Sequence, residues 1–134
     1  MSAKKFNAVI VEDGLEYVEI IKVAMVMNGR FHFRHFDNGW DAFNYLKDQE
    51  TIDLLITDIV MPKMDGLEMV ERLKGIRRLP PTIFLSMKSD EEHISKAMSL
   101  GALDYIKKPF SPMKLLDKIN QFSKAKDVMS SNDG

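Results

Sequence analysis

The 134-residue chain contains no cysteine, so disulfide bonds and thiolate metal sites are excluded. Its uninterrupted apolar runs, such as residues 23–27, are far shorter than the roughly 20 residues that cross a bilayer. The first residues, MSAKK, lack the apolar segment of a signal peptide. From these absences we expect a cytoplasmic protein that does not enter a membrane.

The sequence also lacks an excess of charge of either sign. The 19 Lys and Arg residues are balanced by 20 Asp and Glu residues, which gives a formal net charge of −1. Because a nucleic-acid-binding domain usually carries a basic face, we do not expect this domain to bind nucleic acid. Its composition is that of an average globular protein, with 45% hydrophobic and 29% charged residues, and its length fits one domain.

Five short segments have the composition of β-strands. They cover residues 6–11, 31–36, 53–57, 82–86 and 104–107. The first, third and fourth segments are nearly continuous apolar runs, which are typical of strands buried on both faces of a sheet. The second and fifth segments are more polar, which favours edge positions.

A segment with apolar residues at helical spacing follows each predicted strand. Helices are predicted over residues 15–27, around residues 40–46 and 67–73, from Ser89 or Asp90 to Gly101, and over residues 112–122 after an N-cap at Ser111. Five strand–helix units predict an α/β fold, with a parallel sheet and helices on both of its faces. The doubly wound, flavodoxin-like strand order 2-1-3-4-5 places the two polar strands at the edges.

The sequence becomes polar after Phe122. We expect one folded domain over residues 1–123. Residues 124–134 are expected to be a polar tail or a truncated linker that ends without ordered structure.

Acidic residues follow two strands that the predicted order makes neighbours. Glu12 and Asp13 come after the first strand, and Asp58 comes after the third. Open α/β sheets bind ligands at the carboxyl ends of their strands, so we expect these carboxylates to converge there. Three carboxylates in one crevice repel one another and need a counter-charge, for which Lys108 and a bound cation are the candidates. Oxygen ligands favour a hard cation, and Mg²⁺ fits best.

The same loop argues against a nucleotide- or flavin-binding protein. It begins with Glu12-Asp13 rather than with glycine, and the sequence contains neither GxGxxG nor GxxxxGK[ST]. A phosphate would enter only on a metal ion, beside Lys108 and the hydroxyl of Ser86. Such an arrangement favours transfer of a phosphoryl group to a carboxylate, which gives an aspartyl phosphate.

Four motifs occur in a characteristic order, each at the end of a predicted strand or directly after it. They are Glu12-Asp13, the segment DIVMPKMDG at residues 58–66, Ser86, and the segment GALDYIKKPF at residues 101–110. Over about residues 5–123, the chain therefore resembles a response-regulator receiver domain of two-component signalling.

The resemblance implies a phosphorylated residue and a metal site. It makes Asp58 the phosphoacceptor. It makes Asp13 and Asp58 ligands of Mg²⁺, with the backbone carbonyl of Val60 as a third ligand. Glu12 is implied to act on the metal through a water molecule.

The resemblance also implies the groups that respond to the phosphoryl group. Lys108 is the residue that pairs with it, and the Lys108–Pro109 peptide bond is expected to be cis. Ser86 and Tyr105 correspond to the two switch residues that turn inward after phosphorylation.

The implied function is that of a phospho-accepting switch rather than an enzyme for an external substrate. The donor is a histidine kinase or a phosphotransfer protein, and the chain itself catalyses only self-phosphorylation and slow autodephosphorylation. Phosphorylation is expected to change the face made by the fourth helix, fifth strand and fifth helix, which controls a downstream partner or output domain or forms a homodimer. The alternatives are a small-molecule phosphotransferase or phosphatase with an aspartyl-phosphate intermediate, and a docking receiver that is never phosphorylated.

Several residues also have simpler interpretations. Asp13 alone would be read as a helix N-cap. Asp65-Gly66 is read as a turn in which glycine permits a positive φ. His32 and His35 are three residues apart on a strand, so they point to opposite faces and do not form a metal pair. Met87 follows Ser86 and is expected to narrow access to Asp58, which would slow phosphoryl exchange.

Overall fold

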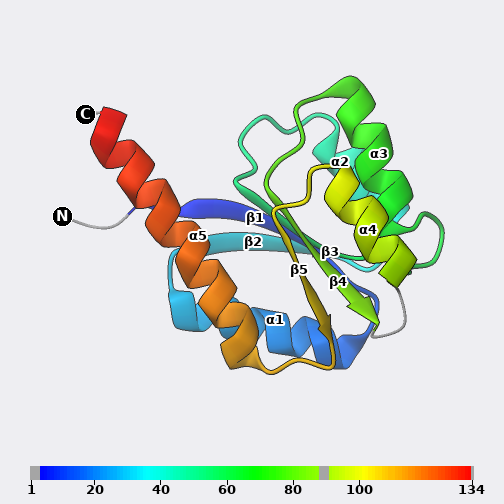
Figure 1. The fold of residues 1–134 in the computed structure, drawn as a ribbon, viewed down its shortest axis with the longest axis horizontal. Coiled ribbons are helices and arrows are strands. Elements are labelled where there is room, and N and C mark those ends of the chain that lie inside the picture. The colour runs from blue at the N-terminus through cyan, green and yellow to red at the C-terminus, as the bar shows by residue number, and fades with distance from the viewer. Residues whose placement is uncertain (1–3, 88–90, 134) are drawn as a thin grey trace.

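The computed structural model describes residues 4–87 and 91–133, in which strands and helices alternate (Figure 1). The strands are β1 (Phe6–Val11), β2 (Phe31–Phe36), β3 (Leu54–Asp58), β4 (Thr82–Met87) and β5 (Asp104–Lys108). The helices are α1 (Leu15–Asn28), α2 (Gly39–Leu46), α3 (Gly66–Ile76), α4 (Glu91–Ser99) and α5 (Pro112–Asp133). The predicted N-cap of α4, at Ser89 or Asp90, lies outside the described residues.

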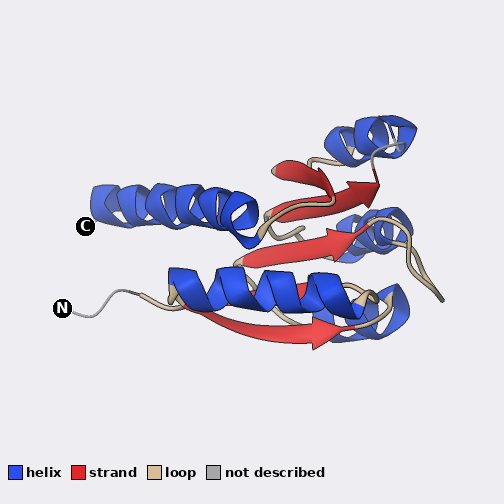
Figure 2. Ribbon diagram, turned by 90° about the horizontal axis from the view of Figure 1, so that it is seen from below, coloured by secondary structure: helices blue, strands red, loops and turns tan. Residues whose placement is uncertain are grey.

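The strands form one parallel sheet in the order β2-β1-β3-β4-β5. Helices α1 and α5 cover one face of the sheet, and α2, α3 and α4 cover the other (Figures 1 and 2). The predicted fold class and strand order are therefore confirmed. The two polar strands, β2 and β5, are the edge strands, as their composition indicated.

The central strands contribute side chains to two separate cores. In β3, Leu54 and Ile56 point toward α1 and α5, whereas Leu55 points toward the helices on the opposite face. All three side chains are completely buried. Strand β3 therefore has no solvent face, which explains its continuous apolar sequence.

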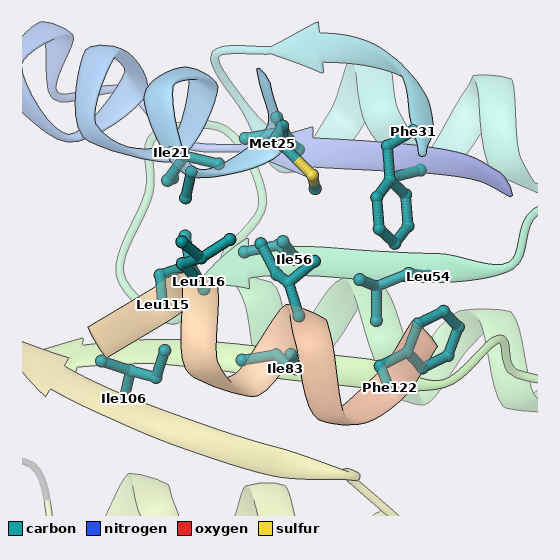
Figure 3. Close-up of a cluster of buried hydrophobic side chains, with 14 of the residues drawn as sticks. Ile21, Met25, Phe31, Leu54, Ile56, Ile83, Ile106, Leu115, Leu116 and Phe122 are labelled. Carbon is teal, nitrogen blue, oxygen red and sulfur yellow. The ribbon is translucent and has the colours of Figure 1, made fainter. Parts of the chain in front are cut away.

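The core beneath α1 and α5 is filled by aliphatic and aromatic side chains (Figure 3). Ile21 and Met25 come from α1, and Leu115 and Phe122 come from α5. The ring of Phe122 packs with two further aromatic rings, those of Phe6 and Phe31, at centroid distances of 5.7 and 6.1 Å. This apolar packing fixes both helices against the sheet.

Helix α5 continues much further than the sequence predicted. It runs through Asp133 and extends beyond the end of the sheet (Figure 2). The Arg30 guanidinium forms two hydrogen bonds to the Asp127 carboxylate, at 2.6 and 2.8 Å, and the Asn28 amide donates to the Asn120 side chain at 2.8 Å. The expectation of a tail without ordered structure is therefore wrong through Asp133, because the polar residues there belong to an exposed helix. The domain boundary at residue 123 stays a prediction.

None of the helices within residues 4–87 and 91–133 combines the length and the apolar character that crossing a membrane requires.

Candidate functional site

The three predicted carboxylates meet at the carboxyl end of the sheet. Strands β1 and β3 are parallel neighbours in which Val11 pairs with Thr57, so Glu12 and Asp58 leave the sheet side by side. Oxygen atoms of Glu12, Asp13 and Asp58 all lie within 4.8 Å of one another. Glu12 and Asp58 are buried, whereas Asp13 is exposed. The convergence predicted from the strand order is present.

Lys108 lies between two of these carboxylates. Its Nζ atom is 2.8 Å from Glu12 Oε1 and 2.9 Å from Asp58 Oδ2, and the residue is only 7% exposed. Lys108 is the last residue of β5, and its peptide bond to Pro109 is cis. The structure thus places Lys108 where a counter-charge was expected.

The pKa values of the cluster reflect its burial. Burial raises the pKa of Glu12 to about 6, and the nearby Asp58 charge adds to this rise against the opposing bond from Lys108. Burial also raises the pKa of Asp58, although Lys108 and the Ile59 N–H oppose it. Burial lowers the pKa of Lys108, but its bonds to Glu12 and Asp58 outweigh this effect, so the net shift is upward. The crevice therefore disfavours uncompensated carboxylates and favours an additional cation.

The donor atoms in the crevice fit a hard cation. All three acidic side chains offer carboxylate oxygens. Among the residues that the structure describes, no His or Cys belongs to this cluster. Asp58 Oδ1 already accepts a hydrogen bond from the Ile59 N–H at 2.8 Å, but a carboxylate oxygen can accept more than one interaction. A site of carboxylate oxygens is the kind that binds Mg²⁺ in proteins.

Ser86 and Tyr105 lie on the neighbouring strands β4 and β5. Asp58 pairs with Leu85 in the β3–β4 register, so Ser86 is one residue further along β4. Ser86 is completely buried, and its Oγ has no hydrogen-bond partner among the described residues. Tyr105 is half-buried in β5, beside Phe84 of β4.

Two apolar side chains are exposed next to these site residues. Val60, two residues after Asp58, is 57% exposed, and Met87, directly after Ser86, is 54% exposed. Met87 pairs with Lys108 in the β4–β5 register. The effect of Met87 on access to Asp58 stays a prediction.

The structure corrects the interpretation of Gly66. Asp65 caps α3, because its Oδ1 accepts a hydrogen bond from the Glu68 N–H at 2.8 Å. Gly66 does not have a positive φ, so the conformational freedom cited for a turn is not what requires glycine here. A Cβ atom at Gly66 would lie 2.1 Å from the carbonyl oxygen of Asp58. Glycine is needed there because the start of α3 packs directly against the backbone of Asp58.

The simpler interpretation of Asp13 is wrong. The N-cap of α1 is Gly14, and within the described residues no side chain forms a capping hydrogen bond there. The Asp13 carboxylate does not cap α1, and it contributes to the carboxylate cluster instead.

Two residues that contact the site, Tyr17 and His35, were not predicted to do so from the sequence. The Lys108 Nζ atom lies 4.3 Å from the centre of the Tyr17 ring. The His35 Nε2 atom lies 2.8 Å from the backbone oxygen of Glu12. His35 could have been found, because the predicted order places its strand beside the strand that precedes Glu12. Its role is a backbone contact rather than a metal pair with His32.

Comparison with known proteins agrees with this geometry. Residues 8–120 match the family model of the response regulator receiver domain. The response regulator SaeR of Staphylococcus aureus strain USA300 is 34% identical over 114 residues, which cover 85% of this chain and 49% of SaeR. The chain therefore spans about half the length of this relative.

Solved structures show the same similarity. The signal receiver domain of a signal transduction histidine kinase from Syntrophus aciditrophicus is 30% identical, with a TM-score of 0.75 and coverage of 90% of this chain and 91% of that chain. The BeF3-activated DrrB receiver domain is 26% identical, with a TM-score of 0.75 and coverage of 90% and 98%. The strand order, the family match and these similarities together establish that the chain belongs to the response regulator receiver domain family.

Proposed function

We propose that this chain is a Mg²⁺-dependent signalling switch that accepts a phosphoryl group on Asp58. The donor is a histidine kinase or a histidine-containing phosphotransfer protein. Membership of the receiver family supports this class of function. The geometry of the crevice supports the roles of Asp58, Lys108 and Ser86. The roles of Val60 and Tyr105 follow from the resemblance to the family.

The main support is the arrangement of donors around Asp58. Lys108 already contacts Asp58 Oδ2 at 2.9 Å, while the buried Ser86 hydroxyl, one residue beyond the strand partner of Asp58, has no acceptor among the described residues. A phosphoryl group on Asp58 would offer oxygens to both side chains. A buried polar group without a partner costs free energy. Pairing with a phosphoryl oxygen would therefore favour the rotamer that points the Ser86 hydroxyl toward Asp58.

Transfer exchanges one bond to phosphorus for another. A carboxylate oxygen of Asp58 attacks phosphorus, and the bond between phosphorus and the donor imidazole nitrogen breaks. The electron pair of that bond stays on the imidazole. Asp58 must be ionised to attack, and the Lys108 ammonium favours that form by opposing the effect of burial on the Asp58 pKa.

We assign the metal site to Asp13, Asp58 and the backbone carbonyl of Val60. When bound, Mg²⁺ would neutralise charge on the transferring phosphoryl group. Glu12 would act through a water molecule, because its Oε1 already contacts Lys108 and its Oε2 accepts the Gly14 N–H at 2.9 Å.

Phosphorylation would be transmitted through Ser86 and Tyr105. Both turn inward in the proposed mechanism, which changes the face made by α4, β5 and α5. That face would bind a downstream protein or output domain, or a second copy of the chain. Slow hydrolysis of the chain's own phosphate would reset the switch in the cytoplasm.

The proposed domain extends over residues 1–123, and residues 124–134 are a polar tail or linker, which is helical through Asp133. The relative SaeR is about twice as long as the matched region. An output domain joined through α5 is therefore part of the proposal.

Acetyl phosphate tests the proposed function. The wild-type chain should gain one phosphoryl group with Mg²⁺ and none with EDTA, as measured by intact mass spectrometry. Asp58→Asn should abolish this gain. Asp117→Asn is the matched control, because it changes an exposed aspartate on α5 and should leave the gain intact.

Three results would contradict the proposal or redirect it. No Mg²⁺-dependent gain would favour the docking receiver, and a gain that survives Asp58→Asn would place the phosphoryl group elsewhere. Rapid turnover of a small phosphate ester would favour the alternative phosphotransferase or phosphatase.

A further inference from the structure

Tyr17, in the first turn of α1, borders the acidic crevice with its ring. The Lys108 Nζ atom is 4.3 Å from the ring centre, within the about 6 Å over which an aromatic ring attracts a cation. The ring also packs against Phe110, with 5.4 Å between the centroids. Tyr17 therefore connects α1 to the segment that carries Lys108.

The ring adds to two other contacts that the Lys108 ammonium makes within the described part of the chain. Those contacts are with the carboxylates of Glu12 and Asp58. Since Lys108 is only 7% exposed, little water surrounds its charge, and the attraction to the ring is stronger than at an exposed site. The ring attracts the ammonium through its face and accepts no directed hydrogen bond from it. The contact therefore does not compete with phosphoryl oxygens for the N–H donors of Lys108.

Gly14 lies beside both Glu12 and Tyr17. A Cβ atom at Gly14 would lie 3.3 Å from Glu12 Oε2 and 3.5 Å from Tyr17 Cδ2. The Tyr17 N–H donates to the Gly14 oxygen at 3.0 Å, which fixes the start of the helix. The turn at Gly14 thus brings the Glu12 carboxylate and the Tyr17 ring against the same small residue.

We propose that Tyr17 is a positioning residue for Lys108 in phosphoryl transfer. Its ring keeps the ammonium over the crevice, so that the ammonium meets the phosphoryl group as it reaches Asp58. The inference rests on the proposed role of Asp58 as phosphoacceptor. Tyr17 itself contacts no reacting atom, and it acts through Lys108.

The rate of phosphorylation by acetyl phosphate tests the proposal. Tyr17→Leu keeps an apolar side chain but removes the aromatic face, and it should slow phosphorylation by about tenfold, within the range that a cation–π contact supplies. Tyr17→Phe keeps the face and should stay within about twofold of wild type. Equal rates for wild type and Tyr17→Leu, or an equal loss in both variants, would overturn the proposal.

Tyr45 provides a matched control. The Arg34 guanidinium carbon lies 4.7 Å from the centre of its ring, so the contact is similar in kind but lies on α2 and β2. Tyr45→Leu should leave the phosphorylation rate unchanged. A loss in Tyr45→Leu as large as in Tyr17→Leu would show that the rate reports general packing, which contradicts a specific role for Tyr17.

Two further readouts separate positioning from structural damage. The Mg²⁺ dissociation constant of Tyr17→Leu, from calorimetry, should equal that of wild type, because Tyr17 is not a metal ligand. A parallel loss of Mg²⁺ affinity would overturn the proposal. The Lys108 ε-methylene proton resonance should show a ring-current shift in wild type and Tyr17→Phe that Tyr17→Leu removes.

The ring-current measurement needs no phosphoryl donor. If the shift is absent from wild type, the Tyr17 inference fails while the proposed function of Asp58 stands. If the shift is present but wild type accepts no phosphoryl group, the proposed function fails, and the positioning role in transfer fails with it.

Discussion

Two buried regions of this molecule are equally shielded from water but differ in chemistry. Between the sheet and helices α1 and α5, buried side chains such as Ile56 and Phe122 form a wholly apolar cluster. At the carboxyl end of the sheet, Glu12, Asp58 and Lys108 are all less than 10% exposed, yet each carries an ionisable group. The apolar region stabilises the fold, whereas the polar region costs stability and provides the chemistry. A change in the apolar region should therefore have a different consequence from a change in the polar region.

The largest expected effect is a cavity in the apolar region. Ile56 is completely buried in β3, two residues before Asp58. Ile56→Ala should lower the free energy of unfolding by about 3–5 kcal/mol, measured by urea denaturation without metal. The folded fraction should still bind Mg²⁺, because the carboxylates are unchanged.

Ile76→Ala is the matched control. Ile76 is the last residue of α3 and is 59% exposed. The same truncation there should change the free energy of unfolding by less than about 0.5 kcal/mol. An equal loss at both positions would contradict the assignment of stability to the buried cluster.

The next largest effect tests the contact between α3 and Asp58. Gly66→Ala would place a Cβ atom 2.1 Å from the Asp58 carbonyl oxygen. We expect a loss of about 3 kcal/mol in the free energy of unfolding, because backbone must move to relieve the overlap. The shift should displace Asp58 and weaken Mg²⁺ binding, measured by calorimetry.

Gly39→Ala distinguishes strain from damage to the site. Its Cβ atom would lie 2.0 Å from the Met64 carbonyl oxygen, a similarly close approach. We expect a similar loss of stability with a smaller change in Mg²⁺ affinity. Equal losses of Mg²⁺ affinity in the two variants would contradict a specific link between Gly66 and Asp58.

In the polar region we expect a smaller change in the free energy of unfolding, and this change stabilises the protein. Burial raises the pKa of Glu12 from 4.5 to about 6. The native state therefore binds more protons than the unfolded state in this window, and Glu12 makes the metal-free protein less stable as pH rises from about 4.5 to 6. Glu12→Gln removes this ionisation, so it should stabilise the metal-free protein by about 2 kcal/mol at pH 7.

The measurement is urea denaturation of wild type and Glu12→Gln in EDTA between pH 4.5 and 7. Their difference in unfolding free energy should be small at pH 4.5 and should grow up to pH 7. A difference independent of pH would show that the variant acts through packing. Mg²⁺ should reduce the difference at pH 7, because a cation compensates the carboxylates.

The smallest expected effect is at the end of α5, far from both regions. The Asp127 pKa is lowered by its hydrogen bonds to Arg30, and the ion pair is largely exposed on the Asp127 side. Asp127→Asn should leave global stability nearly unchanged but speed amide hydrogen exchange in residues 124–133. Unchanged exchange there would show that the pair does not hold the helix.

The fold was predictable because its signals are strong and local. Continuous apolar runs identify β1, β3 and β4, and the mixed sequences of β2 and β5 identify edge strands. The strand order then predicts that Glu12 and Asp58 become neighbours. The convergence of the carboxylates follows from topology, without any resemblance to known proteins.

Features that depend on packing were not predictable in this way. The end of α5 is held by Arg30, which lies 97 positions from Asp127 in the sequence, so its polar composition was misread as disorder. Gly66 was interpreted as a turn residue because glycine permits a positive φ, although its role is close contact with Asp58. The contact of Tyr17 with Lys108 arises from tertiary packing, and Tyr17 lies in no motif that the sequence singled out.

The position of the phosphoryl group on the chain decides whether Asp58 is the phosphoacceptor. The chain would be treated with acetyl phosphate and Mg²⁺, reduced with borohydride to convert an acyl phosphate to homoserine, and analysed by peptide mass spectrometry. We expect homoserine at residue 58 alone, and none when EDTA replaces Mg²⁺. Modification at another aspartate, or at residue 58 independently of Mg²⁺, would contradict it.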